Sequence, residues 1–152
     1  SNGVPYTAPA LGAFDYVHGE ATRSMPAIGS ASFSPVAGAG SLGAPSGTIN
    51  VDFVQRTIAL QNLAFGLGPL LSFSGLNGSA SYDNTTVGVG SAAGSFSGRY
   101  TSGSCTGCTR FDATASIFSG SFIGRNADGL VFSTLLATGG TPVGGVQLFV
   151  KP

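Results

Sequence analysis

The sequence predicts an all-β protein: an antiparallel, mostly up-and-down β-barrel of about eight strands with a packed apolar interior. Three observations predict this fold. Short segments alternate polar and apolar residues with the period of a β-strand. Stretches rich in turn-forming residues separate these segments, and the 152 residues include 25 glycines and 8 prolines. No amphipathic helical pattern longer than a turn or two interrupts them.

The first half contains the clearest strand pair. Residues 48–53 alternate, so that their apolar side chains share one face and Asp52 lies on the other. A tight turn at residues 55–56 leads into a second strand at 57–63. After a Gly/Pro break, residues 70–76 form the next strand. The Asn77–Gly78 pair that follows is either a turn or a bulge inside a longer strand that continues to Tyr82.

The second half is dominated by a long alternating segment, residues 110–118. Its apolar side chains are predicted to share a face: Phe111, Ala113, Ala115 and Ile117. The segment continues to residue 124, and a bulge near Gly120 would change its direction. In the turn that follows, Asp128–Gly129 favours a positive φ.

The remaining strand signals complete the barrel. They are residues 13–20, 29–34, 95–100, 130–137 and 146–150. Glycines inside strands favour a barrel over an open sandwich, because sharply coiled strands use glycine at corners. These glycines are Gly75, Gly98, Gly120 and Gly124.

Chain length is that of one domain. We expect residues 1–12, which include Pro5 and Pro9, to form an extended N-terminal arm, and residues 13–152 to form a single β-barrel domain. The first residues lack the basic and apolar regions of a signal peptide, so we expect a mature form or an excised domain.

Charge and composition narrow the partners and the compartment. Six Lys and Arg residues balance six Asp and Glu residues, and no basic cluster exists, so a nucleic-acid partner is not expected. No run of about 18 apolar residues predicts a membrane-spanning segment. Abundant Ser, Thr, Gly and Asn with 8% charged residues are typical of exported bacterial β-proteins at the cell surface, outside the cell or in the periplasm.

Two cysteines form a C-x-x-C motif at Cys105 and Cys108. A thioredoxin-like redox site needs a following helix, and zinc needs further ligands where the only histidine is His18. Attachment of haem c needs a histidine directly after the second cysteine, where Thr109 stands. A disulfide that closes a small Gly/Ser loop in an oxidising compartment is the preferred interpretation.

Few residues suggest cofactor chemistry. His18 with Met25 could hold haem or a metal, although a polar strand position explains His18 as well. Tyr82 and Tyr100 could bind iron as phenolates, but no cluster of His and Asp accompanies them. We therefore expect no cofactor and no metal, with haem or iron as the remote alternatives.

Catalysis has no support in the sequence. A single histidine and the lack of a Gly-x-Ser-x-Gly elbow argue against a serine nucleophile. Asp52, Asp83 and Asp112 are too widely spaced to argue for a carboxylate pair. The glycine-rich residues 38–43 precede no helix that could bind phosphate. We expect no catalytic residues and no enzymatic activity.

Residues 111–132 contain motifs that carry a family resemblance. The most specific are Gly120-x-Phe122-x-Gly124, Asn126-Ala127-x-Gly129-Leu130 and, upstream, Gly47-x-x-x-Val51-Asp52-Phe53. Over residues 13–150 the chain resembles the eight-stranded barrel of transferrin-binding protein B lobes, related surface lipoproteins and the C-terminal domain of FecR-type exported proteins. The Gly/Ser loop with the cysteines looks like the FecR-type version. The resemblance implies a non-catalytic exported barrel, although this chain shows neither a second lobe or handle domain nor a FecR helical domain.

Three functions are compatible with these features. The first is a non-enzymatic binding or interaction module on or near the outer membrane, with its loops as the recognition surface. The second is a structural subunit of an extracellular filament or surface layer, in which the arm reaches a neighbouring copy and adds along an edge. The third, a transmembrane β-barrel, requires a polar interior, whereas Asp52, Arg99 and Asp112 on the polar face predict a water-facing exterior.

Overall fold

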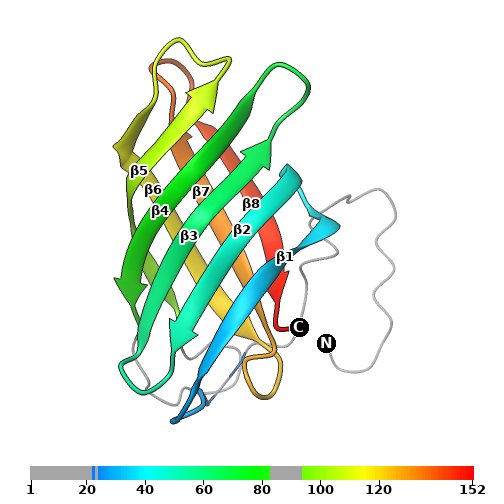
Figure 1. The fold of residues 1–152 in the computed structure, drawn as a ribbon, viewed down its shortest axis with the longest axis vertical. Helices are drawn as coiled ribbons and strands as arrows, with labels where there is room; N and C mark the ends of the chain where they lie inside the picture. The colour runs from blue at the N-terminus through cyan, green and yellow to red at the C-terminus, as the bar shows by residue number, and fades with distance from the viewer. Residues whose placement is uncertain (1–21, 23, 83–93) are drawn as a thin grey trace.

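Eight antiparallel strands form a closed barrel in which each strand pairs with its neighbours in sequence and β8 pairs with β1 (Figure 1). The computed structural model describes residues 22, 24–82 and 94–152. The strands are β1 (Ser30–Gly40), β2 (Gly43–Asp52), β3 (Thr57–Gly66), β4 (Ser72–Ser81), β5 (Phe96–Thr106), β6 (Asp112–Ile123), β7 (Gly129–Ala137) and β8 (Val143–Val150). The predicted up-and-down eight-stranded barrel is confirmed. The expected arm and the strand signal at 13–20 lie outside the described residues.

The β2–β3 hairpin follows the sequence prediction closely. Ile49, Val51 and Phe53 are buried on the inner face, and the turn contains Arg56 with a φ of 59°. The Asp52 carboxylate accepts hydrogen bonds from the amides of Val54 and Gln55, at 2.9 and 3.0 Å, which fixes the turn. The hairpin is therefore specified by local residues alone.

A bulge, not a turn, lies at Asn77–Gly78. β4 continues through both residues to Ser81, and its register with β5 shifts between Ser74 and Asn77. Gly75 has a φ of 62° at this shift, a conformation that glycine adopts without strain. Of the two predicted alternatives, the continuing strand with a bulge is the correct one.

β6 contains a bulge at a different place from the one predicted. Its register with β7 shifts between Asp112 and Ile117, whereas Gly120 pairs regularly on both sides. The Asp112 carboxylate accepts hydrogen bonds from the amides of Thr114 at 3.0 Å and Ala115 at 3.3 Å. These hydrogen bonds hold the extra residues of the bulge. Because the register shift lies between Asp112 and Ile117, the expected bulge near Gly120 is wrong.

The bulge reverses the alternation of β6. Ser116 and Phe118 point into the barrel, and Ile117 is 43% exposed on the outside, so Ile117 does not share a face with Phe111 as predicted. Gly120 serves another purpose, because a Cβ atom added there would overlap the ring of Phe96. Glycine at this position makes room for an aromatic side chain in the core.

The turn between β6 and β7 also differs from the prediction at one residue. Positive φ values occur at Gly124 (87°) and Ala127 (55°), whereas Gly129 already pairs with Ile123 as the first residue of β7. The expected positive φ at Asp128–Gly129 is therefore wrong, because the positive φ values of this turn occur earlier, at Gly124 and Ala127.

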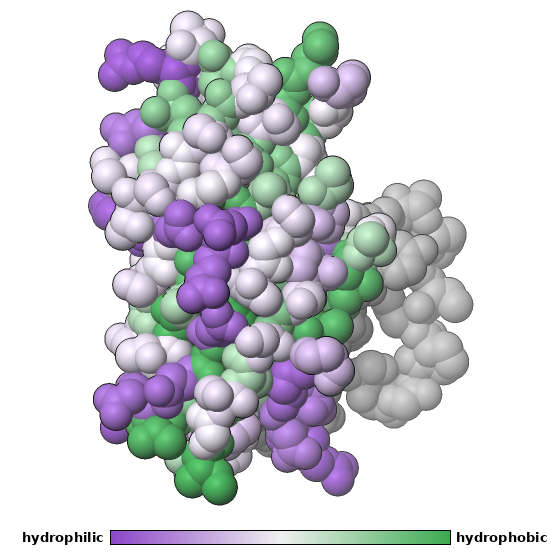
Figure 2. All heavy atoms as spheres, in the orientation of Figure 1, coloured by the Kyte–Doolittle hydropathy of each residue, from purple (hydrophilic) through white to green (hydrophobic). Residues whose placement is uncertain are grey.

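Aromatic side chains fill the barrel interior. Phe132 lies at the centre of this core, with ring centroids 6.4 Å from Phe65, 5.8 Å from Phe118 and 5.6 Å from Phe149. No charged side chain of residues 24–82 and 94–152 is buried, and Figure 2 shows mostly hydrophilic and neutral residues over the β2–β4 face. The predicted packed core is confirmed, and the interior is apolar, as expected of a water-facing barrel.

The β1–β8 seam is the least regular pairing of the barrel. Pro35 pairs with Phe149, but the next pair is Gly40 with Gln147, so β1 bulges away from β8 between them. The buried side-chain amide of Gln147 donates to the carbonyl oxygens of Val36 at 2.7 Å and Ala39 at 2.8 Å. A side chain thus replaces the strand-to-strand bonds that the bulge removes.

Thr22 and Met25, which precede β1, contact the end of the barrel where β6 meets β7. The backbone amide of Thr22 donates to the carbonyl of Phe122 at 3.0 Å, and its hydroxyl donates to the carbonyl of Gly124 at 2.7 Å. Met25 is buried among the same residues, and its sulfur packs beside Gly94.

Candidate functional site

Three connections meet at the upper end of the barrel in Figure 1. They are residues 67–71 between β3 and β4, 107–111 between β5 and β6, and 138–142 between β7 and β8. Antiparallel order places all three at the same end, where the short β1–β2 connection at residues 41–42 also lies. We call the surface formed by the three longer connections the disulfide rim.

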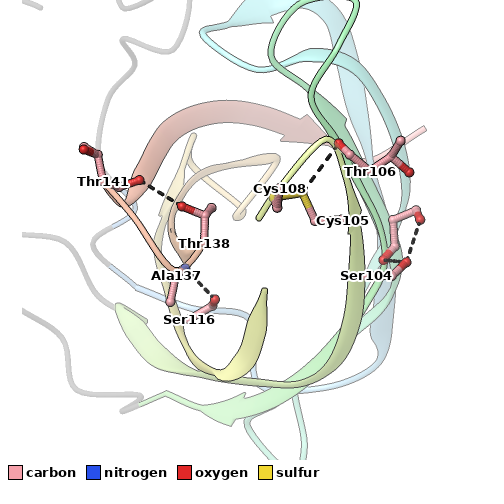
Figure 3. Close-up of a disulfide and its surroundings, with 9 residues drawn as sticks. Ser104, Cys105, Thr106, Cys108, Ser116, Ala137, Thr138 and Thr141 are labelled. Atoms are coloured by element: carbon pink, nitrogen blue, oxygen red, sulfur yellow. Dashed lines mark hydrogen bonds between the residues drawn. A yellow bond between two sulfur atoms is a disulfide. The ribbon is translucent and has the colours of Figure 1, made fainter. Parts of the chain in front are cut away.

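The two cysteines lie in the middle connection of the disulfide rim. Cys105 belongs to β5 and pairs with Phe73, and Cys108 lies just beyond the strand. Their sulfur atoms are at disulfide distance, and their Cα atoms are 5.8 Å apart. Figure 3 shows the pair on the inner side of β5, across the end of the barrel from Thr138 and Thr141. This loop is stiffer than a Gly/Ser loop of the same length without a cross-link.

The middle connection contacts both of its neighbours. A Cβ atom added to Gly107 would overlap the carbonyl oxygen of Leu70 in the β3–β4 connection, so only glycine allows this approach. On the other side the amide of Arg110 donates to the carbonyl of Thr138 at 3.3 Å. Below them, the rings of Phe73 and Phe111 lie 5.5 Å apart. The rim is a braced surface and not three independent loops.

Leu70 is the most prominent side chain of the disulfide rim. It is 84% exposed, the largest exposed fraction among the large apolar side chains of the described residues. Other apolar side chains of this end of the barrel are partly buried and pack on the core, namely Leu67, Leu71, Cys105, Cys108, Phe111 and Val143. Leu70 therefore presents a large apolar side chain to solvent at this end of the barrel.

The sequence placed Leu70 in a strand, which is wrong. β4 begins two residues later, and the amide of Leu67 donates to the carbonyl of Leu71 at 2.9 Å, which closes residues 67–71 into a compact loop. Gly68 and Pro69 directly before Leu70 were the available signal, because a Gly-Pro pair favours a loop and displaces the start of the strand.

Two charged residues flank the disulfide rim. Arg110 is exposed, and Asp112 holds the β6 bulge. The hydroxyl of Thr114 donates to the Asp112 carboxylate at 2.8 Å, and this bond, with smaller contributions from the Ala115 and Thr114 amides and from Arg110, lowers the pKa of Asp112. Asp112 is thus ionised near neutral pH, and the rim offers one cation and one anion to a partner.

The residues suggested for iron or haem are placed unfavourably for that role. Burial raises the pKa of Tyr100, whose hydroxyl bonds to Thr134 at 2.8 Å, and burial also raises the pKa of Tyr82. Both phenols therefore resist conversion to the phenolate that binds iron. Met25 is buried in the core, and His18 lies outside the described residues.

The carboxylates are not brought together either. Asp52 ends β2 at the lower end, Asp112 begins β6 at the upper end, and Asp83 lies outside the described residues. Within residues 22, 24–82 and 94–152, no three His, Cys, Asp or Glu side chains gather where they could hold a metal. In the same part of the chain no helix is long and apolar enough to span a membrane.

Comparison with known proteins supports the fold. No family model and no curated protein matches the chain. Two crystal structures of the vaccine antigen transferrin-binding protein B from Haemophilus parasuis Hp5, a single and a double mutant, are similar to it with TM-scores of 0.51 and 0.50 at 18% identity. The similarity covers 89% and 88% of this chain but only 29% and 28% of those chains.

The chain therefore has a β-barrel fold similar to that of transferrin-binding protein B, and it spans less than a third of that protein's length. At this identity the likeness concerns the fold and not the ligand. The resemblance to FecR-type barrels stays a prediction. Chemically, the disulfide rim can bury apolar surface and pair charges with another protein.

Proposed function

We propose that this chain is a non-enzymatic, exported protein-binding module of the transferrin-binding-protein-like type, and that it acts at the cell surface or in the periplasm, on or near the outer membrane. The disulfide rim is its binding surface, and the partner is another protein. The observation that carries the proposal is Leu70, which protrudes on a base braced by the cysteine loop and by Phe111.

Three features support this proposal. Rigid loops reduce the entropy that binding would otherwise cost, which favours recognition by the braced rim. The rim also contains partly buried apolar side chains, Leu67, Leu71 and Phe111, as the centres of protein interfaces do, and the exposed Arg110 provides a polar margin. A cysteine pair at disulfide distance suits an oxidising compartment outside the cytosol.

A matched pair of variants tests the proposed surface. Leu70→Asp removes the protruding side chain of the rim, and Val54→Asp makes the same kind of change at the opposite end, where Val54 is 58% exposed. The immobilised wild type and the Val54→Asp variant should retain the same extracellular and envelope proteins of the source organism. Leu70→Asp should retain at least about tenfold less of them, the loss that a central contact causes. Equal retention by all three chains would contradict the proposal.

A second candidate is a structural subunit of an extracellular filament or surface layer, with residues 1–12 as an arm on a neighbouring copy and residues 13–152 as the barrel. The overall charge favours it, because six cations and six anions cancel and copies do not repel one another at long range. The closed barrel pairs every strand on both sides, so the arm would bind a face rather than a sheet edge. Fibres in negative-stain images without detergent would support this candidate, and discrete particles would count against it.

A further inference from the structure

The outside of the barrel is chemically divided into two parts. On β2 to β5 the outward side chains are mostly hydroxyls and amides, such as Asn50, Ser79 and Thr101. On β6 to β8 the alternation places seven aliphatic side chains outward. These are Ile117 and Ile123 of β6, Val131 and Leu135 of β7, and Val146, Leu148 and Val150 of β8. We call this surface the aliphatic face.

The aliphatic face lies on the most regular part of the sheet. β6 and β7 pair without a shift from Ile117 to Ile123, and β7 pairs with β8 without a shift over its length up to Leu136. By contrast, the register shifts in the pairings β2–β3, β3–β4 and β4–β5, and β8 has a shift on its other side, where it pairs with β1. A regular pleat lets outward side chains from neighbouring strands form straight rows, and such rows can interdigitate with another sheet about 10 Å away.

The polar groups on this face are paired within the chain. The hydroxyls of Ser119 and Ser133 lie 2.8 Å apart between Ile117 and Val131, and those of Ser95 and Ser121 lie 3.3 Å apart. Hydroxyls that already bond to each other lose little when water leaves the surface. Burial of the face is therefore favourable for its aliphatic side chains and nearly neutral for its serines.

Charge is confined to the borders of the aliphatic face. β7 and β8 contain no charged residue, and the nearby Lys151 and Asp128 pair with each other at 3.8 Å. On the other border, the exposed Arg99 of β5 pairs in register with Ile117, and its guanidinium donates to the carbonyl oxygen of Thr114 at 3.5 Å. A surface without charge offers nothing to a strongly charged partner, but it can meet an identical surface with no like-charge repulsion. The zero net charge of the whole chain removes the long-range repulsion as well.

We propose that the aliphatic face is an interface with a second copy of this chain, in which two barrels pack face to face about a twofold axis. Such a dimer is isologous, because the same rows of Val131, Leu148 and their neighbours meet in both copies. It is independent of the disulfide rim and leaves that rim free for another protein.

The size of the face predicts a weak dimer. Three strands are about 15 Å wide and seven residues are about 24 Å long, so the flat area is about 350 Å² per copy. Stable interfaces bury about 800 Å² per partner, so association should appear only at high micromolar to millimolar concentration. A dimer of this strength forms where the protein is crowded at a surface.

Sedimentation of the full chain tests the proposal. Between about 10 µM and about 1 mM, the average mass of the wild type should rise from 15.0 kDa toward twice that value. Leu148→Lys adds a charge within the face and should weaken association at least about tenfold, because the ammonium group would lose its water in the interface without a partner of opposite charge. Ser79→Lys adds the same charge on the polar side of the barrel and should leave association unchanged.

Folding and rim function are checked in the same samples. Far-UV circular dichroism confirms that each variant is folded, and Val131→Ser replaces Leu148→Lys if that variant is not. Leu148→Lys and Ser79→Lys should both still retain the protein that binds the disulfide rim. This readout separates failure of the dimer proposal from failure of the proposed function. A wild type that stays at 15.0 kDa at about 1 mM, or equal weakening by Ser79→Lys, would overturn the proposal and leave the N-terminal residues or another protein as the occupant.

Discussion

Gln147 on β8 donates a hydrogen bond of 2.8 Å to the carbonyl oxygen of Ala39 on β1, and this contact closes the barrel at the place where β1 bulges away. The same amide reaches Val36, so one side chain satisfies two backbone carbonyls. Gln147 and Ala39 are 108 residues apart in sequence, and their hydrogen bond joins the two ends of the sheet.

Replacement of Gln147 by leucine should therefore destabilise the barrel. Gln147→Leu leaves the buried carbonyl of Ala39 and the partly buried carbonyl of Val36 without their donor. It also removes Gln147 Oε1, which is buried without a partner among the described residues, so we expect a net loss of about 1–2 kcal/mol in the free energy of unfolding. Urea denaturation measures it. The control Gln61→Leu, at an exposed position of β3, should change stability by less than about 0.5 kcal/mol. Equal effects of both variants would contradict the role of Gln147.

Glycine at position 120 should be required for packing and not for backbone conformation. Gly120→Ala places a methyl group against the ring of Phe96, and overpacking of this kind costs about 1–3 kcal/mol. Gly140→Ala is the matched control, because nothing lies within 4 Å of the added carbon and the φ of Gly140 is not positive. The midpoint of thermal or urea unfolding should fall for the first variant and stay level or rise for the second.

Alkaline pH should weaken the barrel through Tyr100. Burial raises the pKa of Tyr100 above the 10.0 of a free phenol, so the unfolded chain loses this proton at a lower pH than the folded one. The stabilisation by the neutral phenol is complete below pH 10 and is lost as pH rises above it, by about 1.4 kcal/mol per pH unit. Tyr100→Phe should flatten this dependence in urea denaturation between about pH 8 and about pH 11.

At neutral pH the two core tyrosines should respond differently to loss of the hydroxyl. Tyr100→Phe removes the bond to Thr134 and should cost about 1 kcal/mol. The hydroxyl of Tyr82 is buried and finds no partner among the described residues, so Tyr82→Phe should be neutral or stabilising by about 1 kcal/mol. A larger loss for Tyr82→Phe than for Tyr100→Phe in chemical denaturation would contradict the assigned contacts.

Cys105 and Cys108 should be oxidised in the protein isolated from its native compartment. Alkylation without reductant should modify neither cysteine, and alkylation after reduction should modify both, as intact-protein mass spectrometry would show. Because the closed loop is so short, the Cys105→Ser/Cys108→Ser variant should lose only about 2 kcal/mol of stability. Full alkylation of the untreated protein would contradict the disulfide.

Local sequence patterns predicted the fold, but they did not predict for every strand which side chains face the barrel interior. The β2–β3 hairpin depends on neighbours in sequence, with alternating residues up to Phe53 and a turn at Arg56, and it was predicted correctly. The phase of β6 depends on the Asp112 carboxylate, which captures two backbone amides and inserts a bulge. The alternation of apolar residues does not reveal these hydrogen bonds, so Ile117 was assigned to the wrong face.

The candidate site could be predicted only in part. The C-x-x-C motif indicated that Cys105 and Cys108 lie close together, and the structure places them so. The prominence of Leu70 depends on where β4 begins, and the contact of Gly107 with Leu70 joins two different connections. Contacts between loops leave no period in the sequence, so the rim became visible only in three dimensions.

The up-and-down order of the strands has a consequence for how the barrel folds. All pairings except β1–β8 join consecutive strands, so hairpins can form one after another from contacts that are near in sequence. The β1–β8 pairing alone must bring together the first and the last strand, such as Ser34 and Val150, and it can form only after the sheet has curled. We therefore expect the β1–β8 pairing to form last and to set the folding rate, with the side-chain hydrogen bonds of Gln147 completing it.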